Sequence, residues 1–246
     1  MVLLNGCGRP KVAFLRPGIY DEPFMKKKSF LFVIEGINGA GKSTQARMLL
    51  RTLRLLRFDA VSYREPTRGR WGREIRAKAK LAGSLTPAQE LDLFLRDRRE
   101  NVEKNILPGL EKGRVILLDR YYFSSVAYQG AKGIDPGRIR RLNERFAPKP
   151  DLVFILDLPA ARGLGRIEGR KTRDLLFEKE RYLRKVRRIF AGFRGPRFVH
   201  LDGGREKRAL GAEILALTLK KMGRSGIIFD HERRPEKIDH PHRQNR

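Results

Sequence analysis

The stretch that most constrains the fold is residues 30–44, FLFVIEGINGAGKST. Its first five residues are apolar β-formers, and Gly36, Gly39 and Gly41 then interrupt the pattern before a helical periodicity begins. A strand, a glycine-rich loop and a helix in this order form a P-loop, whose backbone N–H groups converge on phosphate oxygens. The stretch therefore predicts a nucleoside-triphosphate site, and a strand–turn–helix with accidental glycines is the alternative.

Two side chains of the loop have predicted chemical roles. Lys42 would reach the β- and γ-phosphates, and the Ser43 hydroxyl would bind Mg²⁺. The other positions would contribute to the same cradle: Gly36, Ile37, Asn38, Gly39, Ala40, Gly41 and Thr44. ATP and Mg²⁺ are the expected cofactors.

Strand and helix patterns alternate along the chain, which has 246 residues and 40% hydrophobic content. Five short apolar strands are predicted at 30–34, 60–63, 114–118, 152–156 and 198–201. Helical patterns follow them, among them 42–57, 69–82, a stretch from Thr86 to about 105, and 207–222. Thr86 and Gln89 match a capping box. We therefore predict one α/β domain at 25–222, a five-stranded, doubly wound parallel sheet with helices on both faces, the P-loop NTPase fold, and a short lid at about 159–176.

The two ends of the chain lack this alternation. Residues 1–24 are rich in glycine and proline without periodicity, so we expect an extension upstream of the true start, Met25. Residues 223–246 are predicted to be a disordered basic tail. The net charge of +27 lies mainly between these ends and favours anionic partners, although a basic surface without a single partner is the alternative. The single cysteine excludes a disulfide framework within the chain and favours the cytoplasm, and no membrane anchor is implied.

Charged residues follow two of the predicted strands. Asp119 stands at the C-terminal edge of strand 114–118, where open α/β sheets bind ligands, and it is the candidate Walker-B-type carboxylate for Mg²⁺. Arg64 and Glu65 end the second strand, immediately before Pro66. These positions would meet the P-loop at one edge of the sheet.

Four blocks in order resemble the thymidylate kinase family. They are EGINGAGKSTQ at 35–45, REP at 64–66, DRY with SSVAYQG at 119–130, and PDL at 150–152. The resemblance covers about residues 28–222 and implies transfer of the γ-phosphoryl group of ATP to dTMP, giving dTDP for dTTP biosynthesis. The expected partners are these nucleotides. Nucleic acid and membrane are not expected, and a homodimer is a possible assembly.

The resemblance also implies roles for single residues. Phe94 would stack on thymine and Arg98 would donate to a base carbonyl, whereas without the family they would be core and an exposed helix charge. Arg120 would bind the acceptor phosphate. The remaining substrate positions would be Arg64 and Glu65, beside the acceptor nucleotide, and Ser125, Tyr128 and Gln129, around its base and sugar. Arg68 competes with Arg64 for the monophosphate, and we leave that choice open.

The P-loop itself contains no arginine, so the donor-side cation is expected from the lid. Arg162, Arg166 and Arg170 recur every four residues and would share a helical face, with Arg166 and Arg170 as catalytic candidates beside Lys42, Asp119 and Arg120. A solvated or RNA-like basic stripe is the alternative.

Two features depart from the family pattern. Asn38 stands where the family commonly carries a carboxylate near the sugar 3′-hydroxyl, and an amide oxygen can accept the same hydrogen bond without charge. The acids in RDLLFE at 173–178 are also spaced differently.

Two other functions remain open. A deoxynucleoside kinase would use Glu65 as the base for a 5′-hydroxyl. A nucleic-acid-associated P-loop ATPase is suggested by the charge, but it would need a binding module that the sequence does not show.

Overall fold

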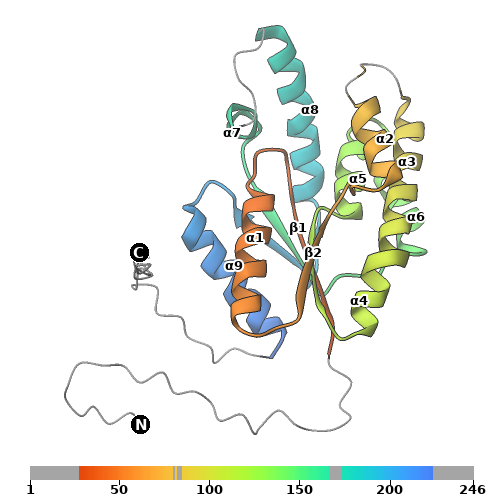
Figure 1. Ribbon diagram of the computed structural model, residues 1–246. Coiled ribbons are helices and arrows are strands. Elements are labelled where there is room, and N and C mark those ends of the chain that lie inside the picture. Colours follow the sequence, from red (N-terminus) through yellow and green to blue (C-terminus); the bar gives the residue numbers. More distant parts are fainter. Residues whose placement is uncertain (1–27, 80, 82–84, 167–172, 224–246) are drawn as a thin grey trace, which may run out of the picture.

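The computed structural model describes residues 28–79, 81, 85–166 and 173–223, with the backbone alone for 173–179. The predicted extension at 1–24, nearly all of the predicted tail and Arg170 lie outside these residues. At the centre is a parallel sheet with the strand order β2-β3-β1-β4-β5 (Figure 1). The strands are β1 (Phe30–Gly36), β2 (Ala60–Arg64), β3 (Val115–Asp119), β4 (Leu152–Asp157) and β5 (Phe198–Asp202).

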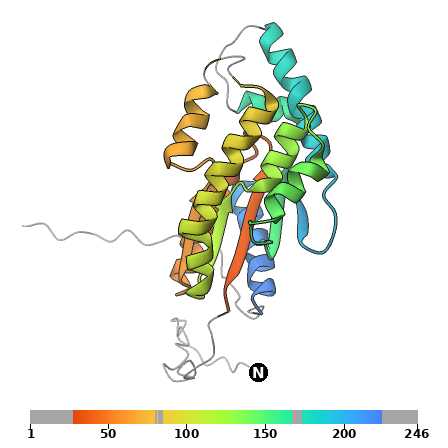
Figure 2. The same ribbon diagram turned by 90° about the vertical axis from the view of Figure 1, so that its right-hand side faces the viewer.

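Helices cover both faces of this sheet, as predicted. On one face lie α1 (Lys42–Leu55) and α9 (Lys207–Lys221). On the other lie α3 (Pro87–Asn101), α4 (Leu107–Glu111), α5 (Tyr122–Gly130), α6 (Pro136–Glu144) and α8 (Arg173–Ala191) (Figures 1 and 2). The short helix α2 (Arg70–Lys78) packs against α3, and α7 (Ala160–Gly165) against α8. The predicted fold class is confirmed.

The strands are apolar because helices exclude water from both faces of the sheet. Every residue of β1 is buried, and β3 and β4 are buried over nearly their whole length. Such continuous apolar runs are typical of parallel strands with helices on both sides. Strand order reverses at β1, whose neighbours are β3 and β4, so the crevice beyond its C-terminal end is the expected ligand position.

Two helix predictions differ from the structure at their ends. The helix from Thr86 does not end near 105, because a π-helical turn, η1 (Val102–Ile106), joins α3 to α4. Pro108 stands in the first turn of α4, where its missing N–H is tolerated, so the helical run continues to Glu111. The helix predicted at 69–82 ends at Lys78. The capping box is confirmed: Gln89 N donates to Thr86 Oγ1 at 3.2 Å, and Thr86 N donates to Gln89 Oε1 at 2.9 Å.

No helix in the described segments is both long and apolar enough to span a membrane.

Candidate active site

The P-loop needs glycine for two different reasons. Gly36 and Gly39 adopt φ values of 138° and 80°, in the region that favours glycine. At Gly39 a Cβ atom would also lie 2.2 Å from the backbone oxygen of Gly163 in α7. The loop backbone therefore packs directly against α7, and Arg166, the residue after α7, lies against the same loop.

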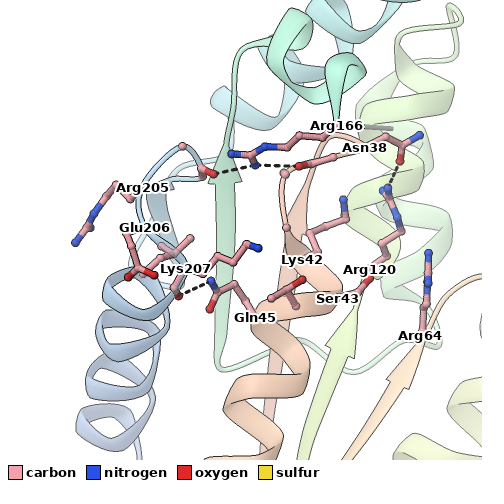
Figure 3. A pocket seen from close by; sticks show the side chains of 17 residues that line it. Asn38, Lys42, Ser43, Gln45, Arg64, Arg120, Arg166, Arg205, Glu206 and Lys207 are labelled. Carbon is pink, nitrogen blue, oxygen red and sulfur yellow. Dashed lines mark hydrogen bonds between the residues drawn. The ribbon is translucent and has the colours of Figure 1, made fainter. Parts of the chain in front are cut away.

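A cavity of about 960 Å³ opens beside the loop (Figure 3). Its walls are the P-loop and the first turn of α1, Arg64 at the end of β2, Arg120 after β3, Arg166 after α7, residues 203–206 between β5 and α9, and Lys207 and Leu210 of α9. Arg166 reaches over this cavity, whereas Arg205 points away from the other labelled side chains. The volume is in the range of small-molecule sites, and several walls are cationic. The cavity thus suits a nucleotide with a charged phosphate chain.

Lys42 is buried at the base of this cavity. Its Nζ donates to the Ile37 backbone oxygen at 2.6 Å. Burial lowers the pKa of Lys42 well below its usual value, the nearby Arg120 lowers it further, and Asp119 and Glu35 oppose the shift. An anion bound in the cavity would favour the charged ammonium form.

Ser43 and Asp119 form a pair of oxygen donors where α1 begins and β3 ends. Ser43 Oγ donates to Asp119 Oδ2 at 2.5 Å, and Arg64 Nε lies 3.6 Å from the same oxygen. Asp119 Oδ1 is buried and has no hydrogen-bond partner among the described residues. Hard oxygen ligands and an unsatisfied carboxylate oxygen fit Mg²⁺, which commonly binds one or two carboxylates and completes its shell with phosphates and water. The described residues contain no cluster of three or more His, Cys, Asp or Glu side chains that could hold a metal ion. Phosphate and water would therefore supply most of the ligands.

Arg120 stands one residue beyond β3 in a left-handed conformation, with φ of 76°. Its guanidinium donates from Nη1 to Ser124 Oγ at 3.0 Å and from Nη2 to Asn38 Oδ1. The same group lies 5.2 Å from the ring centre of Tyr128, whose hydroxyl donates to Asn38 Oδ1 at 3.3 Å. Three predicted site residues, Asn38, Arg120 and Tyr128, are therefore brought together at the mouth of the P-loop.

A second cluster of predicted residues is fully buried. Arg98 is 1% exposed, and it donates to Glu65 Oε2 at 2.8 Å, to Asn143 Oδ1 at 2.6 Å and to Ser125 Oγ at 3.1 Å. Glu65 also accepts from Asn101 Nδ2 at 3.2 Å. Burial raises the pKa of Glu65, and Arg98 opposes the shift. The alternative that Arg98 is an exposed helix charge is wrong.

Among the described residues, no side-chain hydrogen bond joins Phe94 or Gln129 to a member of either cluster. Phe94 is half-buried on α3, one helical turn before Arg98. Gln129 is buried, and its Nε2 donates at 3.1 Å to Glu90, which also accepts from Lys132. Its Oε1 is buried without a partner among the described residues. The sequence placed Gln129 around the base and sugar and did not predict its hydrogen bond to Glu90 on α3.

Comparison with known proteins agrees with this geometry. The sequence model of a family described as thymidylate kinase matches residues 34–214. A thymidylate kinase from Akkermansia muciniphila is 46% identical over 77% of this chain and 91% of its own length. One from Brachyspira hyodysenteriae is 41% identical over 76% and 92%, and one from Xanthomonas campestris 46% identical over 68% and 72%.

The chain belongs to the thymidylate kinase family. The family predicted from the sequence, and with it a nucleotide kinase that uses ATP, is confirmed.

In this thymidylate kinase family member the predicted lid, at about 159–176, is described only in part. Helix α7 ends at Gly165, and Arg166 follows as its C-cap, so the described helix does not carry three arginines on one face. Arg166 Nη1 donates to the backbone oxygens of Gly39 at 3.1 Å and Gly203 at 3.3 Å. It therefore bridges the P-loop and the β5–α9 loop. Arg170 lies outside the described residues.

A second cavity, of about 1120 Å³, lies between α1, the end of β2 and α3. Arg47, Arg64, Arg68 and Arg76 line it together with Ser43 and Asp119. Arg64 lines both cavities, whereas Arg68 lines only this one of the two. The positions of Arg64 and Arg68 thus do not decide which of them binds the acceptor phosphate in this thymidylate kinase family member.

Sequence reasoning missed several polar residues that hold the site of this thymidylate kinase family member. Glu35, at the end of β1, is completely buried and accepts three hydrogen bonds from the turn after β3. Asn101 and Asn143 complete the Glu65–Arg98 cluster. For Glu35 a signal existed, because a carboxylate in an otherwise apolar buried strand must be hydrogen-bonded. The two asparagines carried no comparable signal.

Proposed function

We propose that this chain transfers the γ-phosphoryl group of ATP to dTMP and so supplies dTDP for dTTP synthesis. The observation that carries the proposal is the position of Arg120. Its backbone turn brings a guanidinium from the end of β3 to Asn38 in the P-loop. A cation suited to an acceptor phosphate therefore stands beside the cradle of the donor phosphates.

On the donor side, the P-loop amides and Lys42 bind the phosphate chain of ATP. In the structure Lys42 Nζ donates to the Ile37 backbone oxygen, and Arg166 donates to two backbone oxygens. Phosphate oxygens are stronger acceptors than these carbonyls, so both cations can exchange one partner for the other. Arg166, with Arg170 as the second candidate, then stabilises charge on the transferring group.

Ser43 and Asp119 would hold Mg²⁺ through their oxygen atoms. When bound, the ion neutralises part of the charge on the phosphate oxygens and favours their in-line arrangement. The buried, unpartnered Asp119 Oδ1 supports this assignment.

On the acceptor side, Arg120 binds the phosphate of dTMP, assisted by Arg64 or Arg68. The attacking oxygen is already ionised, so the reaction needs positioning more than a general base. Phe94 stacks on the base. Arg98 has five N–H groups, and three of them bind Glu65, Asn143 and Ser125, so two can donate to a base carbonyl. Tyr128 and Gln129 complete the proposed wall around the sugar and base.

The deoxynucleoside kinase alternative is not favoured. It needs Glu65 as a free base for a 5′-hydroxyl. The Glu65 carboxylate is 2% exposed and is bound to Arg98 and Asn101. Abstracting a proton would require breaking a buried ion pair.

A phosphorylation panel tests the proposal. The purified full chain is assayed with ATP and dTMP, dUMP, dCMP, dGMP or thymidine, and each product is resolved by chromatography. We expect dTMP to be the best acceptor and thymidine not to react. Faster phosphorylation of thymidine than of dTMP would overturn the proposal.

We further propose that the enzyme acts in the cytoplasm on free nucleotides, since its single cysteine suits a reducing compartment.

A further inference from the structure

A buried carboxylate anchors the turn that carries Arg120. Glu35 is 0% exposed at the end of β1. Its Oε1 accepts from Tyr121 N at 2.7 Å and Ser124 N at 3.1 Å, and its Oε2 accepts from Ser124 Oγ at 2.6 Å. A fully buried carboxylate is costly unless such bonds satisfy it. Glu35 thereby caps the start of α5 from a strand that lies far away in sequence.

The same contacts set the direction of the Ser124 hydroxyl. Because a carboxylate can only accept, the hydroxyl proton of Ser124 points to Glu35. The lone pairs of Ser124 Oγ are then available to Arg120 Nη1, which donates to it at 3.0 Å. The left-handed backbone of Arg120 is a conformation that persists only when its surroundings hold it.

We propose that Glu35 and Ser124 are positioning residues for phosphoryl transfer, which act by fixing the Arg120 guanidinium at the mouth of the P-loop. The proposal rests on the proposed function, in which Arg120 binds the acceptor phosphate. Neither residue needs to touch a nucleotide. In this proposal both act on the acceptor phosphate through Arg120.

Glu35→Gln separates positioning from capping. The amide oxygen of glutamine can still accept from Tyr121 N and Ser124 N, so the start of α5 keeps its cap. The amide nitrogen replaces Oε2 and donates to Ser124 Oγ, so the hydroxyl proton loses its acceptor and one lone pair is occupied. The link to Arg120 is disturbed, and the lost charge also removes the support that Glu35 gives to the pKa of Lys42, so Ser124→Ala is the more selective variant.

The experiment is a double-mutant cycle with Ser124→Ala, Arg120→Ala and the double variant, repeated with Glu35→Gln in place of Ser124→Ala. We expect Ser124→Ala and Glu35→Gln each to lower kcat/KM for dTMP on the order of tenfold through lost orientation, with KM for ATP unchanged in Ser124→Ala. In the Arg120→Ala background Ser124→Ala should have no further effect, and Glu35→Gln should keep only the smaller effect that it exerts through Lys42. Thr218→Val is the matched control, because it removes a buried hydroxyl that donates only to a helix carbonyl, and it should leave kcat/KM unchanged.

Equal losses in both backgrounds would overturn the inference, because the residues would then act independently of Arg120. The midpoints of urea unfolding of the same variants provide a second readout that needs no turnover. Non-additive midpoint shifts support the link between Ser124 and Arg120, and additive shifts overturn it. A wild-type chain that does not phosphorylate dTMP would instead overturn the proposed function, and the unfolding cycle would still decide the inference.

Discussion

In the proposed site, the donor-side cations Lys42 and Arg166 and the acceptor-side cation Arg98 are held in different ways. On the donor side, Lys42 and Arg166 donate to backbone oxygens that line an open cavity. On the acceptor side, the guanidinium of Arg98 is bound by the side chains of Glu65, Asn143 and Ser125, and is 1% exposed. In the first set the acceptors are uncharged backbone carbonyls, which phosphate oxygens can replace. The second is a charged, buried network.

This difference has an energetic consequence. A bond to a carbonyl can be exchanged for one to a phosphate oxygen with little loss, so the donor side can reorganise when ATP binds. Removing one partner of a buried ion pair lowers the free energy of unfolding by several kcal/mol, because the other charge stays buried and unpaired. Substitutions in the buried Glu65–Arg98 cluster should accordingly lower stability, whereas substitutions of cations that donate to exchangeable neutral acceptors should lower turnover.

The largest effect is expected from Glu65→Ala. Removing this carboxylate leaves the Arg98 charge buried, so the free energy of unfolding should fall by about 3–5 kcal/mol. Urea unfolding measures it. The matched control is Asp92→Ala, whose exposed pair with Arg96 should contribute less than about 1 kcal/mol. Equal losses in the two variants would contradict the contrast between buried and exposed pairs.

Next comes Arg120→Ala, which removes the proposed phosphate contact. The rate on dTMP should fall on the order of 10²-fold or more through loss of a charge-assisted contact, and Glu65→Gln should lower it less. Steady-state kinetics with dTMP measures both. Arg114→Ala is the control, because its pair with Asp59 lies at the other end of β3. If Arg120→Ala spares thymidine phosphorylation and Glu65→Gln abolishes it, the deoxynucleoside kinase alternative is correct.

For the lid, Arg166→Ala should lower kcat and kcat/KM together, on the order of tenfold, because one of several cations around the transferring group is lost. ATP binding, measured by calorimetry, should stay close to wild type. Arg188→Ala, an exposed arginine of α8, is the control and should change neither value. Full activity in the double variant Arg166→Ala, Arg170→Ala would refute a catalytic lid.

The smallest effect is expected at a half-exposed pair away from both cavities. Arg187 binds Asp157 through two hydrogen bonds of 2.6 and 2.8 Å, and these bonds lower the pKa of Asp157 while partial burial opposes the shift. A lowered folded-state pKa stabilises the fold above the ordinary aspartate pKa, and the stabilisation is lost as pH falls through the lowered value. Asp157→Asn should therefore cost less than about 1 kcal/mol at neutral pH. Urea midpoints across a pH series should converge with wild type in acid, and a gap that widens in acid would contradict the assignment.

Local patterns were sufficient for most of the fold. The five strands, the glycine loop and the capping box at Thr86 depend on residues within a few positions of each other, so periodicity and turn chemistry reveal them. The end of this helical run was mispredicted. Pro108 usually signals a helix end, but here a π-helical turn precedes α4 and Pro108 stands in the first turn of α4, so the run continues. The arginine stripe of the lid stays a prediction, because α7 ends at Gly165 and Arg170 lies outside the described residues.

By itself the sequence determined the P-loop, the sheet, and the positions of Asp119 and Arg120 at the edge where ligands bind. Only the tertiary structure decided the partners of these residues. The Glu65–Arg98, Asn38–Arg120 and Glu35–Ser124 contacts join residues 33, 82 and 89 positions apart. Such contacts form only after the strand order places β1 beside β3 and packs α3 against α5. A buried charge then takes the partner that the packing brings to it, and no local pattern encodes that choice.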